Sequence, residues 1–224
     1  MLNLINIYIF ILYIFMNILN NYVFLYELHT LVFFSILLYI FFRLSFYKVC
    51  GFIIFIMVFL FYFFRIPDVN PNLTSKYLYA PCYGKIKQIT QTNNYLHIVT
   101  FINVTDPHIQ YFPYSGFLKK IIYKKGEFNP AYMIHKGKDN EKMIYHLDTI
   151  RGNIIVSQVA GVLARTIVPF VKENTPVQQN QEIGLIKLGS RCDVFIPLYN
   201  NMKVLVKKGD YVKGTFTKIV EFLN

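Results

Sequence analysis

Cysteine is scarce in this chain, and the positions of its thiols exclude two classes of protein. Among 224 residues, only Cys50, Cys82 and Cys192 are cysteines. Three scattered thiols without a Cys-x-x-Cys pair provide neither a disulfide framework nor the usual ligands of a zinc site. His135 and His146 show no metal-ligand spacing either. We therefore expect structural thiols and no metal centre.

Charge is almost absent from the first part of the chain. Only three charged residues precede Arg65, namely Glu27, Arg43 and Lys48. Apolar runs cover residues 2–25, 31–42 and 51–64. The first is long enough to span a bilayer, which takes about 20 residues, whereas the other two suit a tight hairpin, a re-entrant pair or one bent helix.

These runs predict an integral membrane anchor over residues 1–66, with two or three transmembrane helices. A secretory signal peptide is disfavoured, because a basic start and a small-residue cleavage site are both missing. Pro67 and Pro71 indicate a linker over residues 67–76. The sequence does not determine which membrane holds the anchor.

Positive charge dominates the rest of the chain. From Arg65 onward, 21 Lys and Arg residues stand against 11 Asp and Glu residues. A basic surface beside a bilayer attracts anionic lipid head groups. Nucleic acid is the competing partner, but no arginine-rich stripe, zinc knuckle or aromatic stacking signature supports it. We expect membrane lipids as partners and no nucleic acid.

Residues 77–224 have the pattern of a mainly β domain. Short runs of Val, Ile, Tyr and Phe alternate with Gly, Pro and Asn. Residues 171–177 and 206–212 repeat a Val-Lys…Val spacing, which favours a barrel-sandwich-like architecture. A helix is expected between Val156 and Val168, so the fold class is α+β with one or two helices. A biotinyl-type carrier is disfavoured, because no Met-Lys-Met-like lysine is present.

The most informative stretch is the Gly-x-Ile-x-x-Gly-Ser-Arg sequence that contains Gly189 and Ser190. A Gly-Ser pair between two strands is commonly an ordinary bulge, since glycine relieves local strain. Here it is followed by Asp-Val-x-x-Pro and preceded by Gln-Val-Ala-Gly-x-Leu-Ala-Arg over residues 158–165. This combination resembles the phosphatidylserine decarboxylase family.

The resemblance implies a self-processing proenzyme. In this family, the serine attacks the carbonyl before it, and the chain separates between the positions of Gly189 and Ser190. Ser190 would then become a pyruvoyl group, which forms a Schiff base with the substrate amine and assists loss of carbon dioxide. The implied activity is a carboxy-lyase that converts phosphatidylserine to phosphatidylethanolamine. Chains 1–189 and 190–224 would stay together, and a homodimer is left open.

A second motif, Asp106-Pro-His108, follows a predicted strand over residues 95–102. An isolated Asp-x-His is most often a loop histidine without catalytic work, and the carboxylate can orient the imidazole only if the loop curls. Its surroundings, Phe-Ile-Asn-x-x-Asp-x-His and then Pro-x-x-Gly, resemble the histidine segment of the same family. The resemblance implies acid–base work for His108, with Asp106 in a supporting role.

Two further segments complete the resemblance. Residues 126–131 match a Gly-x-Phe-x-x-Ala turn, and Asn140-Glu141-Lys142 matches an Asn-Glu-Arg triplet with Lys in place of Arg.

Other positions depart from the family. Tyr83 occupies the place of an aspartate that is thought to assist processing in several members, and Tyr111 replaces a second histidine found in some. Arg165 is followed by Thr166 instead of a second arginine, which weakens an expected phosphate contact. Two hypotheses remain: an active decarboxylase, with Tyr83 and Arg165 as supporting residues, or a non-catalytic lipid-binding homologue that no longer cleaves itself.

Overall fold

The computed structural model describes residues 28–92, 94–130, 134–161, 167–186, 190–199 and 201–223. Contacts between residues divide the chain into two compact units, 1–67 and 68–224. Each unit is described separately below.

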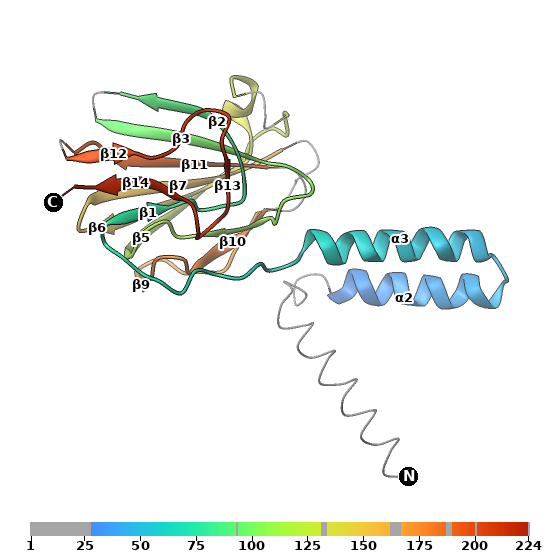
Figure 1. The fold of residues 1–224 in the computed structure, drawn as a ribbon. Helices are drawn as coiled ribbons and strands as arrows, with labels where there is room; N and C mark the ends of the chain where they lie inside the picture. The colour runs from blue at the N-terminus through green and yellow to red at the C-terminus, as the bar shows by residue number, and fades with distance from the viewer. Residues whose placement is uncertain are drawn as a thin grey trace, which may run out of the picture. The chain divides into compact units, whose positions relative to one another are not determined.

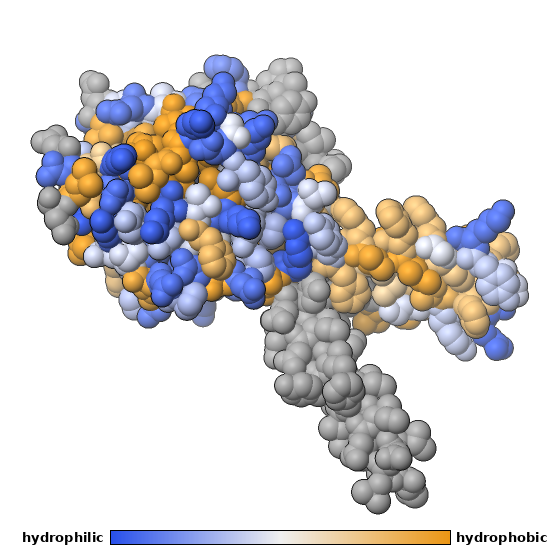
Figure 2. Space-filling model, in the orientation of Figure 1, coloured by the Kyte–Doolittle hydropathy of each residue, from blue (hydrophilic) through white to orange (hydrophobic). Residues whose placement is uncertain are grey.

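In the first unit, the two shorter apolar runs form a helical hairpin. Helix α2 (Leu28–Arg43) and helix α3 (Tyr47–Phe63) lie side by side (Figure 1). The connection turns through Ser45, whose backbone is left-handed at φ 61°. Large apolar side chains are exposed along both helices, and Figure 2 shows them covering the hairpin.

The membrane prediction is only partly tested by these helices. Among the described residues, neither α2 nor α3 combines the length and apolar character required to cross a membrane. The first apolar run, residues 2–25, lies outside the described residues.

The second unit is built around one large antiparallel sheet. It has eight strands in the order β13 (Tyr211–Val212), β2 (Gly84–Gln91), β3 (Tyr95–Ile102), β11 (Ser190–Pro197), β7 (Gly152–Ala160), β6 (Lys142–Thr149), β5 (Gly116–Lys124) and β9 (Thr175–Val177).

Two three-stranded sheets accompany it. One has the order β1 (Tyr77–Tyr79), β14 (Lys218–Phe222), β12 (Met202–Val204), and the other β4 (Ile109–Tyr111), β10 (Glu182–Ile186), β8 (Ile167–Pro169). A short 3-10 helix, η2 (Lys136–Asp139), lies between β5 and β6. The mainly β class with helices is confirmed, but none of the three sheets described closes into a barrel.

The helix predicted between Val156 and Val168 is wrong at both of its ends, which are strands. Residues up to Ala160 belong to β7, Ile167 begins β8, and residues 162–166 lie outside the described part. Strand β7 runs between β6 and β11, and all of its residues from Val156 to Ala160 are buried, whichever face their side chains are on. A strand buried on both sides reads as a continuous apolar run, which periodicity alone cannot distinguish from a buried helix.

The core covers one face of the large sheet. Along β7, Ile154 and Val156 are fully buried in it, as are Cys192 and Val194 along β11. Alternate residues of a strand point to opposite faces, so this face also receives Ser190. The position of Ser190 is therefore determined by the packing of the core.

The alternation along β7 can be tested by a matched pair of substitutions. Ile154 is fully buried, whereas the next residue, Ile155, is half-buried on the opposite face. Ile154→Ala should lower the free energy of unfolding by roughly 2–5 kcal/mol, because it leaves a cavity in the core. Ile155→Ala should cost clearly less, as measured by urea unfolding of the full chain. A larger loss at Ile155 would contradict the orientation of β7.

Candidate active site

Ser190 is the first residue of β11, at one end of the large sheet. Its Cα is paired with Ile102, the last residue of β3, and with Ala160, the last residue of β7. Three strands therefore meet at this point, and two of them end there. Ser190 is held in register from both sides.

The hydroxyl of Ser190 is buried and unusual. The residue has no exposed surface, and its Oγ has no hydrogen-bond partner within the described part of the chain. A buried polar group without a partner costs about 1–3 kcal/mol, so few persist without a role. Gly189, on the other side of the predicted cleavage bond, lies outside the described residues.

The chain is also fixed just before residues 187–189, which lie outside the described part. Strand β10 ends at Ile186, whose backbone N–H donates a 3.2 Å hydrogen bond to the carbonyl oxygen of His108. Four residues later, Ser190 pairs with Ile102 at the end of β3. Ile186 and Ser190 are thus connected to the two ends of one loop, which carries the predicted histidine.

His108 is fully buried in that loop. Its Nδ1 lies 2.7 Å from the backbone carbonyl oxygen of Asp106. Because a carbonyl oxygen can only accept, Nδ1 carries the proton in this contact. In the neutral form of the ring, this places the lone pair, and with it the capacity to accept a proton, at Nε2.

Asp106 contacts the ring of His108 through its backbone rather than through its carboxylate. The loop does curl, but the backbone carbonyl of Asp106 orients the imidazole, whereas its carboxylate points elsewhere. Carboxylate Oδ2 accepts hydrogen bonds from the backbone N–H and the side-chain amide of Asn103, at 2.9 and 3.2 Å. Oδ1 accepts a 2.7 Å hydrogen bond from the hydroxyl of Tyr211.

A buried chain of polar side chains supports the same loop. The Gln110 amide donates to the carbonyl of His108 at 2.6 Å, and the Gln158 amide donates to Gln110. The Tyr145 hydroxyl donates to Gln158 at 2.6 Å, and burial raises the pKa of Tyr145, so the phenol remains a donor. All of these side chains are fully buried. Polar residues within apolar strands could have indicated this network from the sequence.

The Asn140-Glu141-Lys142 triplet holds the end of β7 next to Ser190. The buried Asn140 amide donates to the carbonyl of Ala160 at 2.7 Å, and the Ala160 N–H donates to the carbonyl of Glu141 at 3.0 Å. The same Asn140 side chain exchanges hydrogen bonds with the backbone of Asn129. This triplet therefore fixes the strand end that pairs with Ser190.

The two tyrosines that depart from the family pattern lie near each other. Tyr111 is fully buried, and burial followed by the charge of Glu182 and the nearby Tyr83 raises its pKa. The phenol of Tyr111 thus remains protonated and cannot act as a base at neutral pH. Tyr83 is half-buried, and its ring packs on Gly214 so closely that a Cβ added to this glycine would lie 3.0 Å from the ring. Arg165 lies outside the described residues.

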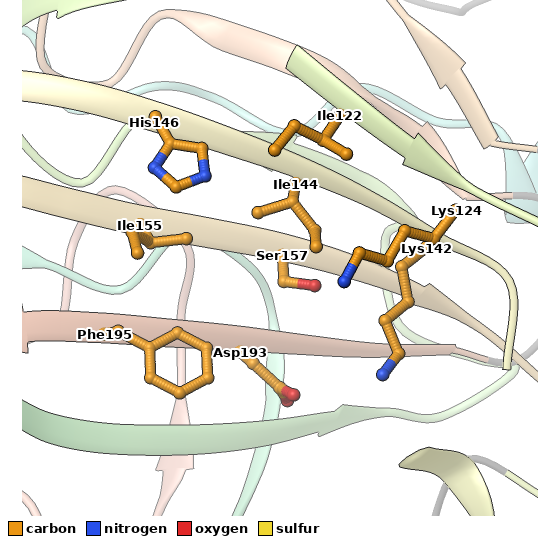
Figure 3. Close-up of a pocket in the computed structure, with 9 residues that line it drawn as sticks. All are labelled: Ile122, Lys124, Lys142, Ile144, His146, Ile155, Ser157, Asp193 and Phe195. Atoms are coloured by element: carbon orange, nitrogen blue, oxygen red, sulfur yellow. The ribbon is translucent and has the colours of Figure 1, made fainter. Parts of the chain in front are cut away.

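The opposite face of the sheet carries a separate groove of about 300 Å³ (Figure 3). Ile144, Ile155 and Phe195 contribute apolar lining, and Lys142 and Asp193 lie at its polar end. Burial and the nearby Arg191 lower the pKa of Lys142.

Arg191 and Asp193 alternate with Ser190 and Cys192 along β11, so the groove and Ser190 lie on opposite faces of the sheet. Nε of Arg191 is 2.9 Å from Oδ1 of Asp193, an ion pair without hydrogen-bond alignment. Among the residues that the structure describes, no three His, Cys, Asp or Glu side chains gather as metal ligands.

Comparison with known proteins assigns the chain to a family. Residues 56–217 match the family model described as phosphatidylserine decarboxylase. A protein of Methanosarcina barkeri with the provisional name archaetidylserine decarboxylase proenzyme is 33% identical over 150 residues, which cover 67% of this chain and 70% of that protein.

Two bacterial relatives are named phosphatidylserine decarboxylase proenzyme. The protein of Pelagibacter ubique is 32% identical over 163 residues, covering 68% of this chain and 74% of that protein. The protein of Carboxydothermus hydrogenoformans is 30% identical over 177 residues, covering 75% and 83%. The family match extends over both the Ser190 strand and the His108 loop, and the chain therefore belongs to the phosphatidylserine decarboxylase family of carboxy-lyases.

Proposed function

We propose that this chain cleaves itself between Gly189 and Ser190 and then decarboxylates phosphatidylserine to phosphatidylethanolamine and carbon dioxide. The observation that carries the proposal is the buried hydroxyl of Ser190, which has no hydrogen-bond partner among the described residues. Ser190 begins β11, which pairs with β3, and β3 leads into the loop of His108. The hydrogen bond of Nδ1 leaves Nε2 of this histidine as the nitrogen that can accept a proton. These are the parts that serine-driven backbone cleavage requires.

Cleavage needs a nucleophile and a proton acceptor. The Oγ of Ser190 attacks the carbonyl carbon of Gly189, a C–O bond replaces the amide C–N bond, and the freed amine gains a proton. Loss of the Cα proton of Ser190 then expels the Gly189 carboxylate, and hydrolysis of the resulting dehydroalanine releases ammonia. Nε2 of His108 is the proposed proton acceptor, because Nδ1 is already committed to the carbonyl of Asp106.

The surroundings of Ser190 fit the pyruvoyl cofactor that this route would leave. Its carbonyl would supply an electron sink for the electrons released when the substrate loses its carboxylate. Ser190 has no exposed surface, and Cys192 follows it on the same buried face. This chain therefore excludes bulk water from the position where a reactive carbonyl would form, and β3 and β7 hold that position on both sides.

The strand pairing also supports our proposal that chains 1–189 and 190–224 stay together after cleavage. Strand β11 pairs along its length with β3 and β7, while β14 pairs with β1 and β13 pairs with β2. These ladders join the two chains without any covalent link. A homodimer remains a prediction, which light scattering of the purified protein would test.

The lipid substrate and the membrane location are parts of the same proposal. Exposed apolar side chains on the α2–α3 hairpin, including Phe33 and Phe55, suit contact with lipid tails. The basic excess after Arg65 suits an anionic head group. We propose that residues 1–66 anchor the chain in a membrane as an integral segment. The names of the relatives support serine phospholipids as the proposed substrate class.

One observation favours the alternative of a non-catalytic lipid-binding homologue. Tyr83 occupies the place of an aspartate that is thought to assist processing in several members, Tyr111 occupies the place of a second histidine found in some, and the buried phenol of Tyr111 stays protonated. Neither tyrosine can substitute for a carboxylate or an imidazole as a base. The alternative predicts one uncut chain and no release of carbon dioxide.

The substitution Ser190→Ala should abolish cleavage, because alanine has no nucleophile. Intact-mass measurement of the purified wild-type protein should show two chains, with the chain that starts at residue 190 blocked at its amino end. The variant should show one uncut chain of 26.5 kDa. Ser157→Ala on β7, a buried serine on the opposite face, is the control and should cleave normally. A wild-type chain that stays uncut with Ser190 unmodified would refute the proposal.

The substitution His108→Gln should slow cleavage, turnover or both by about 10²–10⁴-fold, the usual contribution of a general acid–base group. Cleavage is followed by mass spectrometry during cell-free synthesis, and turnover by release of carbon dioxide from labelled phosphatidylserine. His146→Gln is the control, since that half-exposed histidine lines the groove on the opposite face. Wild-type rates in His108→Gln would remove the histidine from the mechanism.

A further inference from the structure

The loop that holds His108 is folded around the carboxylate of Asp106. The Asp106 N–H donates to the carbonyl of Asn103 at 3.0 Å, which closes a tight turn. In return, Asn103 donates its backbone N–H and its side-chain amide to Oδ2 of Asp106. Only 6% of Asp106 is exposed, so its carboxylate depends on protein donors in place of water.

The remaining oxygen of this carboxylate is bonded from a distant part of the sequence. Tyr211 donates its hydroxyl to Oδ1 of Asp106 at 2.7 Å. Tyr211 begins β13, the strand at one edge of the large sheet, where it pairs with Lys85 of β2. Hydrogen bonds to a charged carboxylate are among the stronger ones in proteins.

The Tyr211 hydroxyl and the His108 imidazole are linked through a single residue, Asp106. The Asp106 side chain is held by Tyr211 and Asn103, and the carbonyl of the same residue accepts the proton of His108 Nδ1 at 2.7 Å. Anchoring the side chain restricts the rotation of the residue, and with it the direction of its carbonyl. The direction of that carbonyl determines which ring nitrogen of His108 carries the proton.

We infer that Tyr211 is a positioning residue for His108, which acts through the carboxylate and then the carbonyl of Asp106. The inference rests on the proposed function, because it assigns a supporting group to the proposed acid–base histidine. Tyr211 lies in the segment 190–224, whereas Asp106 and His108 lie in 1–189. The carboxyl-terminal chain thus contributes a part of the histidine site, and its retention after cleavage is a requirement for turnover.

The simpler interpretation is a surface hydrogen bond that contributes only to stability. Tyr211 is 51% exposed, and many exposed polar contacts have little effect. The two interpretations differ in one respect. A stabilising contact would change the unfolding midpoint without affecting the chemical step, whereas a positioning contact would affect kcat and the His108 tautomer.

The test is the substitution Tyr211→Phe, which removes one hydroxyl and retains the ring. We expect kcat for phosphatidylserine to fall about tenfold, as for loss of one hydrogen bond to a charged group, with KM unchanged. Tyr199→Phe is the matched control, a 37% exposed tyrosine of the same segment that packs on the ring of Phe222. It should retain wild-type kinetics, and thermal unfolding of each variant checks that the fold is intact.

A double-mutant cycle tests whether the loss of kcat in Tyr211→Phe depends on the carboxylate of Asp106. In the Asp106→Ala background, the phenol has no carboxylate to bond, so Tyr211→Phe should cause no additional loss of kcat. Fully additive losses would show that Tyr211 acts by another route and would overturn the inference. Unchanged kcat in Tyr211→Phe, with normal wild-type activity, would also overturn it.

A spectroscopic measurement separates the failure of this inference from the failure of the proposed function. The ¹⁵N shifts of the His108 ring, assigned by their loss in His108→Gln, report the tautomer even in an uncut, inactive chain. Wild-type protein should show the proton on Nδ1, and Tyr211→Phe should shift the population toward Nε2. An inactive wild type with this shift would refute the function and support the positioning role. An unchanged tautomer in Tyr211→Phe would refute the positioning role.

Discussion

The antiparallel pairing of β11 between β3 and β7 is the constraint on which the rest of the site depends. It places Ser190 opposite Ile102 and Ala160 and turns its side chain toward the core. A slip of one residue would move every side chain of β11 to the other face and exchange Ser190 with Arg191. Arg191 and Asp193 are buried as an ion pair on the opposite face, and the cost of moving these charges into the apolar core makes that slip unfavourable.

Segments that are distant in sequence also converge near Ser190. Strand β3 ends at Ile102 and leads into the loop of His108, while β10 ends at Ile186 with a hydrogen bond back to His108. Buried amides also fix this loop. The Gln110 side chain donates to the carbonyl of His108, the Gln158 side chain donates to Gln110, and both side chains are fully buried. A network of this kind is stable only when its members are satisfied, and it therefore specifies one conformation.

Local patterns predicted some of these features and missed others. Two motifs could be recognised because each is contiguous in sequence. They are the frame around Gly189 and Ser190 and the Asp106-Pro-His108 motif, and the structure describes all or part of each. The helix predicted near Val156 was wrong, because β-branched residues buried on both faces of β7 produce no alternation. The supporting role predicted for Asp106 stays a prediction, and the structure shows that its backbone carbonyl, rather than its carboxylate, contacts the ring of His108.

By itself, the sequence determined the family, the mainly β class and the two motifs, because these depend on residue type and on spacing along the chain. Only the tertiary structure decided which groups surround them. Tyr211 of β13 meets Asp106 of the loop after β3, and Gln158 of the large sheet meets Gln110 of the β4-β10-β8 sheet, in both cases between segments far apart in the chain. Spacing cannot encode such contacts, since they depend on register, on the face of each strand and on the burial that removes Ser190 from the surface.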